Sequence, residues 1–282
     1  MTLREWLIEG ETQLRAGPHP ERARRDAELL AMRALEWQRS TLMAHVDDEF
    51  PAPNTAMFEG LLARRAAGEP IQYIFGEVEF YGLRFRVTPD VLIPRPETER
   101  VVETVIELAR RFSDPRIVDI GCGSGAIAVA LAHSLPNAQL AATDISPTAL
   151  AIARENAARN GVADRIRFVQ GDLLAPLAGE QFEIVASNPP YVANADRASL
   201  AVEVRDHEPA LALFAGEDGL TVIRRLIPDA FAALVSGGFL VMEIGHDQSA
   251  AVASLLSETG FEEISFVPDL QGIARVARAR RP

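Results

Sequence analysis

The first 70 residues carry hydrophobic positions at helical spacing. Leucine, tryptophan and alanine residues recur every three or four positions in the ranges 3–14, 20–34 and 54–68, which predicts three helices. Pro20 stands at the start of the second range, while Gly68 and Pro70 end the third. Because the apolar faces are short and rich in alanine, we expect a small helical bundle.

The spacing of hydrophobic residues then changes to alternation. Val78 and Phe80 alternate with acidic residues, and beyond Gly82 the apolar residues of 83–87 alternate with arginines. Alternation on both sides of a glycine turn predicts a β-hairpin. The proline-rich range 89–96 follows, and its prolines keep the chain extended.

From Glu97 onward, predicted strands and helices alternate. Strands are expected at 116–120, 139–143, 165–170, 182–187, 239–244, 263–267 and 273–279, and helices at 97–112, 126–133, 147–160, 220–234 and 248–260. This alternation predicts an α/β fold with a doubly wound, mainly parallel, seven-stranded sheet and helices on both of its faces.

These patterns divide the chain into three expected domains or segments. A helical domain occupies 1–72, a β-hairpin and extended linker 73–95, and an α/β domain 96–282. The roughly 25 residues after Tyr191 show no strong periodicity, so we expect a lid or a substrate channel there.

A glycine-rich loop joins the first predicted strand of the α/β domain to its helix. Gly121, Gly123 and Gly125 stand at alternate positions, which lets the backbone turn sharply and approach a ligand closely. The helix that follows directs free N–H groups into the same space. The glycines, with Ala126, also satisfy the dinucleotide fingerprint, so a nicotinamide enzyme is an alternative.

Three acidic residues lie at or near strand ends around this loop. Asp144 ends the second strand, where a carboxylate can accept hydrogen bonds from both ribose hydroxyls of an adenosine. Asp119 precedes the loop and could face a cationic methionine end, which favours S-adenosylmethionine as the cofactor. Asp172 could accept the adenine amino group while Leu173 packs on the ring, although a helix N-cap explains Asp172 equally well. Cys122 has no histidine nearby in sequence, so we interpret it as a small residue filling the loop.

The fourth predicted strand ends in Asn188-Pro189-Pro190-Tyr191. The carboxyl edge of such a sheet is where ligands bind. The side-chain oxygen of Asn188 and the backbone oxygen of Pro189 can accept the two hydrogens of a planar –NH2 group, and Tyr191 can pack on its face. Holding both hydrogens aligns the delocalised nitrogen lone pair with an electrophilic methyl group. We therefore expect Asn188, Pro189 and Tyr191 to be catalytic, and all four residues to bind the substrate.

Composition excludes several other chemistries. All 28 basic residues are arginines, so the sequence contains no lysine. A P-loop nucleotide site, a kinase site and a pyridoxal phosphate Schiff base each need a lysine. One cysteine and five scattered histidines indicate neither a disulfide framework nor a metal site.

Charge and hydropathy narrow the expected partners. The net charge of −12 argues against a protein whose affinity rests on phosphate neutralisation. The sequence has no long apolar run and no basic-then-apolar amino terminus, so we expect a soluble, cytoplasmic protein with no membrane partner. Positive charge for docking would have to come from arginines such as Arg64, Arg65, Arg84 and Arg86.

Taken together, the motifs resemble those of the release factor glutamine methyltransferase family. The glycine loop, Asp144 and Asn188-Pro189-Pro190-Tyr191 are typical of class I S-adenosylmethionine-dependent methyltransferases that act on amino groups. Gly68–Gly76, Ile93–Glu99 and the stretch from Glu208 to Leu220 narrow the resemblance to that family, and it covers nearly the whole chain.

The resemblance implies a Rossmann-like methyltransferase fold, a substrate and a set of site residues. The substrate would be the glutamine side-chain amide in the Gly-Gly-Gln motif of class 1 peptide chain release factors, recognised partly by the helical domain. Asn188 and Pro189 would hold that amide. Cys122 and Ser124 stand at variable positions of the loop, and Leu173 replaces an aromatic residue of some relatives. The expected cofactor-binding residues are Asp119, Gly121, Cys122, Gly123, Ser124, Gly125, Asp144, Asp172, Leu173 and Asn188. We expect a monomer that binds no nucleic acid directly.

The tetrapeptide also leaves a second substrate class open. An exocyclic amine of adenine in DNA or RNA presents the same planar –NH2 group as a glutamine amide. Such an enzyme should carry a basic face for the phosphate backbone, whereas the chain is acidic overall. A nicotinamide oxidoreductase would leave Asn188-Pro189-Pro190-Tyr191 unexplained, and a non-enzymatic scaffold that keeps the fold is a further alternative.

Overall fold

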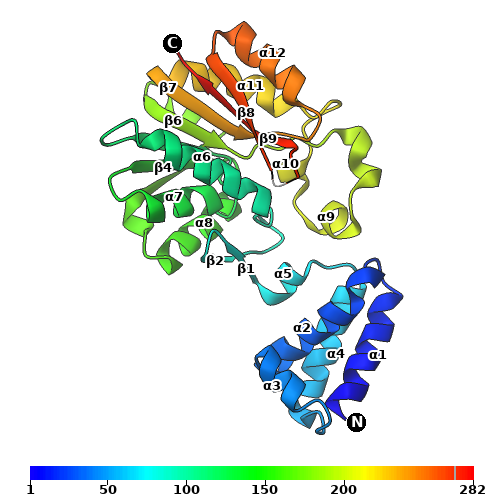
Figure 1. Ribbon diagram of the computed structural model, residues 1–282. Helices are drawn as coiled ribbons and strands as arrows, with labels where there is room; N and C mark the ends of the chain where they lie inside the picture. The colour runs from blue at the N-terminus through cyan, green and yellow to red at the C-terminus, as the bar shows by residue number, and fades with distance from the viewer. Residues whose placement is uncertain (270) are drawn as a thin grey trace. The chain divides into compact units, whose positions relative to one another are not determined.

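The structure of the protein, a computed structural model, describes residues 1–269 and 271–282. The chain forms two compact units (Figure 1). The smaller unit comprises Met1–Gly76 together with Leu200–His207, and the larger comprises Glu77–Ser199 and Glu208–Pro282.

The smaller unit is helical, as the hydrophobic spacing predicts. Its core is built mainly of leucine, alanine and phenylalanine side chains, with Leu30, Leu42 and Phe58 fully buried. The first helix begins at a capping box, in which Thr2 and Glu5 each accept the other's backbone N–H. Its helices are α1 (Leu3–Arg15), α2 (Ala23–Leu35), α3 (Arg39–Ala44), α4 (Ala52–Ala66), α5 (Ile71–Phe75) and α9 (Val202–His207).

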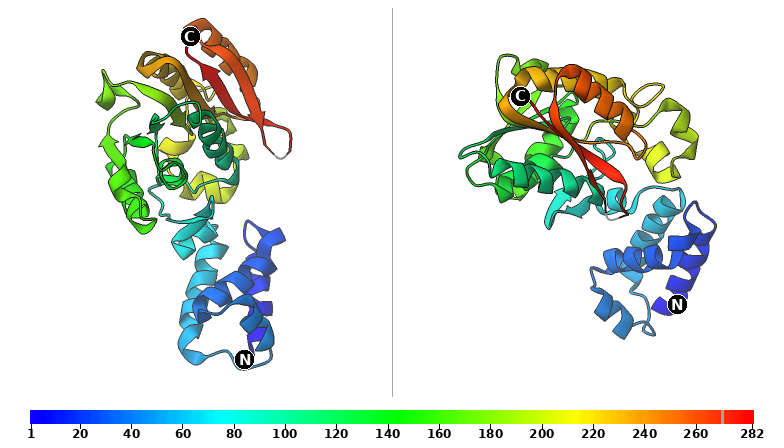
Figure 2. Two further views of the ribbon diagram at one scale, coloured as in Figure 1. Left: turned by 60° about the vertical axis from the view of Figure 1, so that its left-hand side comes forward. Right: turned by 45° about the horizontal axis from the view of Figure 1, so that its top comes forward.

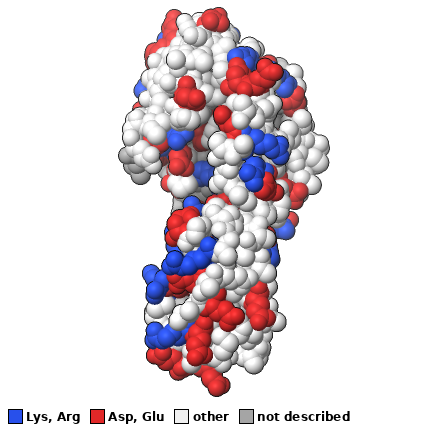
Figure 3. Space-filling view, turned by 90° about the vertical axis from the view of Figure 1, so that its right-hand side faces the viewer, with Lys and Arg blue, Asp and Glu red and all other residues white. Residues whose placement is uncertain are grey.

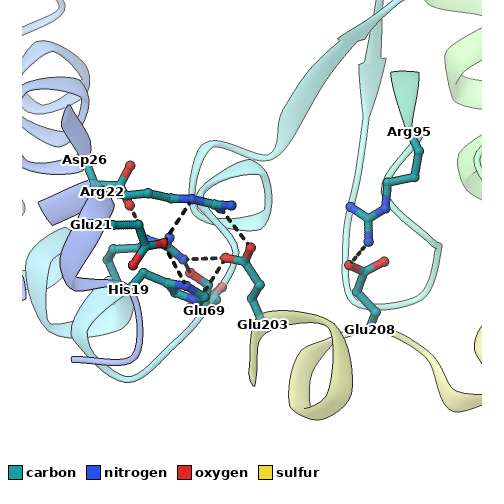
Figure 4. A network of polar contacts seen from close by, with 9 residues as sticks. His19, Glu21, Arg22, Asp26, Glu69, Arg95, Glu203 and Glu208 are labelled. Atoms are coloured by element: carbon teal, nitrogen blue, oxygen red, sulfur yellow. Dashed lines mark hydrogen bonds and ion pairs between the residues drawn. The ribbon is translucent and has the colours of Figure 1, made fainter. Parts of the chain in front are cut away.

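An ion-pair network ties α9 into this helical unit (Figure 4). The guanidinium of Arg65 is buried and lies 2.7 Å from Asp26 and 2.9 Å from Glu203 of α9. Arg22 and His19 lie 3.0 and 3.3 Å from the same Glu203 carboxylate. Sequence spacing gave no sign of this association, because Arg65 and Glu203 stand 138 positions apart.

The larger unit is built on a seven-stranded sheet, which confirms the predicted fold class. The strand order is β5-β4-β3-β6-β7-β9-β8. Strands β3 to β7 pair in parallel, and β9 pairs antiparallel with both β7 and β8. The strands are β3 (Arg116–Ile120), β4 (Gln139–Asp144), β5 (Ile166–Gln170), β6 (Phe182–Ser187), β7 (Leu234–Glu243), β8 (Glu262–Pro268) and β9 (Ala274–Arg280).

Helices cover both faces of the sheet (Figure 2). On one face, α6 (Glu99–Ala109), α7 (Ala126–Ser134) and α8 (Pro147–Arg159) bury their apolar sides in one core. On the other, α11 (Thr221–Ala233) and α12 (Ser249–Thr259) pack in a second core. The central strands are therefore buried on both sides, which explains their nearly continuous apolar sequences.

A separate two-stranded hairpin packs on the first of these cores. It consists of β1 (Glu77–Phe80) and β2 (Leu83–Arg86), paired antiparallel as predicted, and its Phe80 and Phe85 are buried. By packing, the hairpin belongs to the larger unit. The segment boundaries that the sequence predicts after residues 72 and 95 stay a prediction.

Several regions differ from the sequence-based expectation, including α3 and α5, which the hydrophobic spacing did not predict. Strand β7 begins at Leu234, five positions before the predicted start at 239. The sequence pattern missed this first part of the strand because Gly237 (φ +81°) and a register shift interrupt the alternation there. The aperiodic stretch after Tyr191 contains α9 and a short α10 (Ala210–Leu213). Short 3-10 helices lie at Pro20–Arg22, Pro96–Thr98, Ala163–Arg165, Ala175–Leu177 and Asn194–Ser199. Within the described part of the chain, no helix is long and apolar enough to span a bilayer.

Candidate active site

The predicted motifs meet where the strand order of the sheet reverses. Strands β3 and β6 are neighbours, and the chain runs outward from them in opposite directions, through β4 and β5 on one side and β7 on the other. A crevice forms at the carboxyl ends of strands at such a reversal. The glycine loop follows β3 and Asn188 follows β6, so both border this crevice.

A pocket of about 320 Å³ occupies this position in the larger unit. Nine of the predicted site residues line it: Gly121, Cys122, Gly123, Ser124, Asp144, Asp172, Leu173, Asn188 and Pro190. Its other walls include Leu92, Ile127 and Ile145. The size and the mixture of apolar walls with a few polar groups are typical of a small-molecule site.

The glycines of the loop have two different functions in the structure. Gly121 (φ +69°) and Gly123 (φ +53°) line the pocket, and a β-carbon at either position would meet no atom within 4 Å. Gly125 does not line the pocket. A β-carbon there would lie 3.0 Å from the β-carbon of Ala153 on α8, so this glycine is required for helix packing. Its predicted contact with a cofactor stays a prediction.

Asp144 connects the pocket to the loop. Its Oδ2 accepts the N–H of Gly123 at 2.8 Å, and its Oδ1 accepts the N–H of Ser146 at 2.9 Å. Each carboxylate oxygen has a further lone pair, so the side chain can still accept hydrogen bonds from a diol in the pocket. Asp144 thus shapes the loop and presents negative charge to a ligand.

Two buried ionisable side chains belong to this region: Asp119 near the end of β3, and Cys122 within the loop itself. Asp119 is fully buried and outside the pocket lining; its Oδ2 accepts the N–H of Ala128, while its Oδ1 has no hydrogen-bond partner among the residues that the structure describes. Burial raises the pKa of Asp119 to about 7, the Ala128 N–H opposes this, and the charge of Asp144 adds to it. Burial and the same two carboxylates raise the pKa of Cys122, so its thiol stays protonated and is no candidate nucleophile.

The Asp119 carboxyl should make stability depend on pH. Its pKa is about 7 in the folded chain and near 3.8 when unfolded, so between these values only the folded chain holds the proton. The free energy of unfolding contributed by this group therefore falls as pH rises from about 4 to about 7 and is level above that.

Asp119→Asn removes this contribution. In urea unfolding at about pH 5 and about pH 8, the variant should gain stability relative to wild type at the higher pH. If the free energies of unfolding of wild type and Asp119→Asn differ by the same amount at both pH values, the raised pKa of Asp119 is contradicted.

Asp172 and Leu173, which follow β5, form part of the pocket wall. Asp172 pairs with Arg225 of α11, which also lines the pocket, so its carboxylate is not committed to capping a helix. Leu173 has φ +48°, a left-handed conformation that is rare for a leucine, and its carbonyl accepts the hydroxyl of Thr143 at 2.9 Å. Such backbone strain is concentrated at ligand sites.

The Asn188 side chain is held by two residues that the motif does not include. Its Nδ2 donates to Thr98 Oγ1 at 3.0 Å, and the Thr98 hydroxyl donates to Glu243 Oε2 at 2.6 Å. Thr98 and Glu243 are both buried. Glu243 ends β7, the strand next to β6, so the sheet register brings it beside Asn188.

Tyr191 and Pro189 lie behind Asn188. Neither lines the pocket; Pro189 is buried, and the Tyr191 ring packs against the second core. The Tyr191 hydroxyl donates to Glu243 Oε1 at 3.1 Å, and its carbonyl accepts Gln248 Nε2 at 3.0 Å. Burial, chiefly, and the charge of Glu243 raise the pKa of Tyr191, so its hydroxyl stays protonated. A catalytic contact by either residue stays a prediction.

The stretch after α9 closes one side of the pocket. Pro209, Leu211, Ala212 and Phe214 line it. Glu208 fixes the start of this stretch, since its buried carboxylate pairs with Arg95 (Figure 4). The same carboxylate accepts the N–H of Ile93 at 3.3 Å. Arg95 therefore holds a pocket wall within the larger unit.

Sequence reasoning missed Thr98, Glu243 and Arg225 as site residues. Each stands far from its partner in the chain, with 90 positions between Thr98 and Asn188 and 53 between Arg225 and Asp172. Thr98 lies within the Ile93–Glu99 stretch that carried the family resemblance, and this was the one available signal for it.

Two family models match the chain. Residues 5–76 match the PrmC N-terminal domain, and residues 101–205 match the methyltransferase small domain. Among solved structures, the hMettl16 catalytic domain in complex with a MAT2A 3′UTR hairpin superposes with a TM-score of 0.59 at 20% identity, over 90% of each chain. This likeness supports the methyltransferase fold and no more.

Curated relatives match over the full length. The release factor glutamine methyltransferase of Moorella thermoacetica is 45% identical and that of Deinococcus radiodurans 43%, and each alignment covers 100% of this chain and 99% of the relative. The fold, the motifs at the strand reversal and this full-length similarity agree, and the chain belongs to the release factor glutamine methyltransferase family.

Proposed function

We propose that this protein transfers a methyl group from S-adenosylmethionine to the glutamine side-chain amide of the Gly-Gly-Gln motif in class 1 peptide chain release factors. One observation carries the proposal: Asn188 borders the same pocket as the glycine loop, and its amide is held with its oxygen turned away from Thr98. The full-length similarity to enzymes named for this reaction supports it.

The pocket fits S-adenosylmethionine. Gly121 and Gly123 leave an open cradle, and Asp144 supplies a carboxylate for a ribose diol. When bound, this molecule supplies an electrophilic methyl group on a sulfonium. Leu173 and Ile145 offer apolar surface for the adenine ring. Cys122 and Ser124 would contribute through the backbone of the loop.

The side-chain oxygen of Asn188 and the backbone oxygen of Pro189 would position the substrate amide. Each would accept one hydrogen of the glutamine –NH2 group, so that the nitrogen lone pair points toward the methyl group. Positive charge that develops on nitrogen is stabilised by these same oxygens. The alkylated nitrogen loses a proton readily, so no general base is needed before attack.

We further propose that residues 1–72 help to recognise the release factor, and that the enzyme acts as a monomer in the cytoplasm without binding nucleic acid or membrane. On the face shown in Figure 3, arginine and acidic side chains are interspersed, unlike the basic face that a duplex requires. The expectation that Arg65 supplies positive charge for docking is wrong, because Arg65 is buried and paired with Asp26. The adenine alternative is not favoured by the names of the relatives.

The test is a methyl-transfer assay with labelled S-adenosylmethionine. Three acceptors are compared: a purified release factor, the same factor with its Gly-Gly-Gln glutamine changed to alanine, and duplex DNA with structured RNA. We expect label on the unchanged factor alone. Label that persists on the alanine variant would exclude the glutamine assignment, and label on nucleic acid would favour the adenine alternative.

A further inference from the structure

A buried chain of hydrogen bonds ends at the side chain that the proposed reaction depends on. It runs from the Glu243 carboxylate through the Thr98 hydroxyl to the Asn188 amide, with bonds of 2.6 and 3.0 Å. Tyr191 donates to the other oxygen of Glu243. Thr98 is 4% exposed and Glu243 2% exposed, so bulk water does not compete for these bonds.

The structure places Asn188 Nδ2 against Thr98 Oγ1 and Thr98 Oγ1 against Glu243 Oε2, and with Glu243 ionised the count of donors allows only this direction for each bond. An ionised carboxylate is only an acceptor, so the Thr98 hydroxyl must use its single proton on Glu243. The Thr98 oxygen can then only accept, and the group that faces it from Asn188 must be the –NH2. Since the amide nitrogen and oxygen diverge from one carbon, the Asn188 oxygen faces away from Thr98.

We propose that Thr98 and Glu243 are positioning residues that fix the Asn188 amide with its oxygen directed at the substrate amide. This proposal rests on the proposed function for the identity of the substrate, but the orientation itself does not. The nitrogen of a glutamine amide presents two hydrogens, so Asn188 can hold that nitrogen only with its own oxygen forward. The opposite rotamer would set two –NH2 groups against each other.

The orientation depends on the charge of Glu243. Burial raises the pKa of Glu243. The hydroxyls of Thr98 and Tyr191 lower this pKa by donating to the charged form. The charge of Glu97 raises it further, and the charge of Arg275 lowers it. A protonated Glu243 would donate to Thr98 and free the Thr98 proton for the Asn188 oxygen, which permits the wrong rotamer. Turnover should therefore fall as pH is lowered through the pKa of Glu243.

The test compares Thr98→Val, which keeps the shape but removes the hydroxyl, with Thr98→Ser, which keeps the hydroxyl. Thr98→Val should lower kcat by about 10–100-fold, by analogy with residues that orient the side chains ligating a metal, with little change in KM for the release factor. Thr98→Ser should restore kcat. Thr104→Val is the matched control, because Thr104 is a buried threonine of α6 that donates only to the Arg100 carbonyl.

Two further measurements keep the outcome unambiguous. Calorimetric binding of S-adenosylmethionine checks that each variant is folded. NMR hydrogen exchange of the Asn188 Nδ2 protons, assigned by their loss in Asn188→Ala, should be slow in wild type and Thr98→Ser and fast in Thr98→Val. This readout needs neither release factor nor turnover, so it remains valid if the proposed substrate is wrong.

Equal exchange in wild type and Thr98→Val would overturn the proposal. So would wild-type kcat in Thr98→Val, or equal losses in the valine and serine variants. The acid limb of the pH profile should be present in wild type and Thr98→Ser and absent in Thr98→Val, where Glu243 no longer reaches Asn188. If folded wild type methylates no release factor, and Asn188 still exchanges slowly in wild type and fast in Thr98→Val, the proposed function is refuted and the positioning role is not.

Discussion

Replacing Asn188 with alanine should lower turnover by about 10²–10³-fold, the loss expected when one preorganised group that stabilises a transition state is removed. The side chain borders the pocket and is already bonded to Thr98, so little ordering is left for the moment of reaction. Alanine would remove the oxygen that accepts a hydrogen of the substrate amide. Single-turnover methyl transfer with a saturating release factor measures the effect directly.

Cofactor affinity should change much less in this variant, which titration calorimetry can check. The matched control is Asn160→Ala, since Asn160 caps the end of α8 and its side chain donates to the Arg84 and Asn156 carbonyls, away from the pocket lining. Turnover like wild type in Asn188→Ala would place the chemistry elsewhere in the molecule.

Replacing Asp144 with alanine should weaken S-adenosylmethionine binding by about 10²–10⁴-fold, because hydrogen bonds to a charged group are worth about 1.5–3 kcal/mol each and two ribose bonds would be lost. The substitution also frees the N–H groups of Gly123 and Ser146, which the carboxylate now holds at 2.8 and 2.9 Å. The dissociation constant from calorimetry, without any acceptor, reports the effect.

A charge-matched control for Asp144 is Asp164→Ala. Asp164 lies in the 3-10 helix before β5, at the opposite end of the strands, and it does not line this pocket. Its removal should leave the dissociation constant unchanged. Equal affinity in Asp144→Ala and wild type would show that the ribose is held by other groups.

The sequence predicted those parts of the molecule whose signals are local. The strands and helices of the sheet follow from apolar runs of the right length, and β3, β4, β5 and β6 lie within one residue of their predicted bounds at each end. The glycine loop and Asn188-Pro189-Pro190-Tyr191 could be placed at the same edge because the carboxyl ends of parallel strands meet there.

What the sequence could not predict depends on contacts between distant positions. The bond from Asn188 to Thr98 spans 90 positions, and the ion pair between Arg65 and Glu203 spans 138. Gly125 had the spacing of a ligand-binding glycine, but its nearest neighbour is Ala153 of α8. Asp119 had the right charge to face a cation, but the turn of the loop buries it outside the pocket.

The most direct test of the proposed reaction is the position of the methyl group on the product. A release factor is incubated with the enzyme and S-adenosylmethionine, and its peptides are then fragmented in a mass spectrometer. We expect the added mass of one methyl group on the glutamine side chain of Gly-Gly-Gln, and no such addition with Asn188→Ala over the same time. Methylation at any other residue, or an unmodified Gly-Gly-Gln peptide with active, cofactor-bound enzyme, would contradict it.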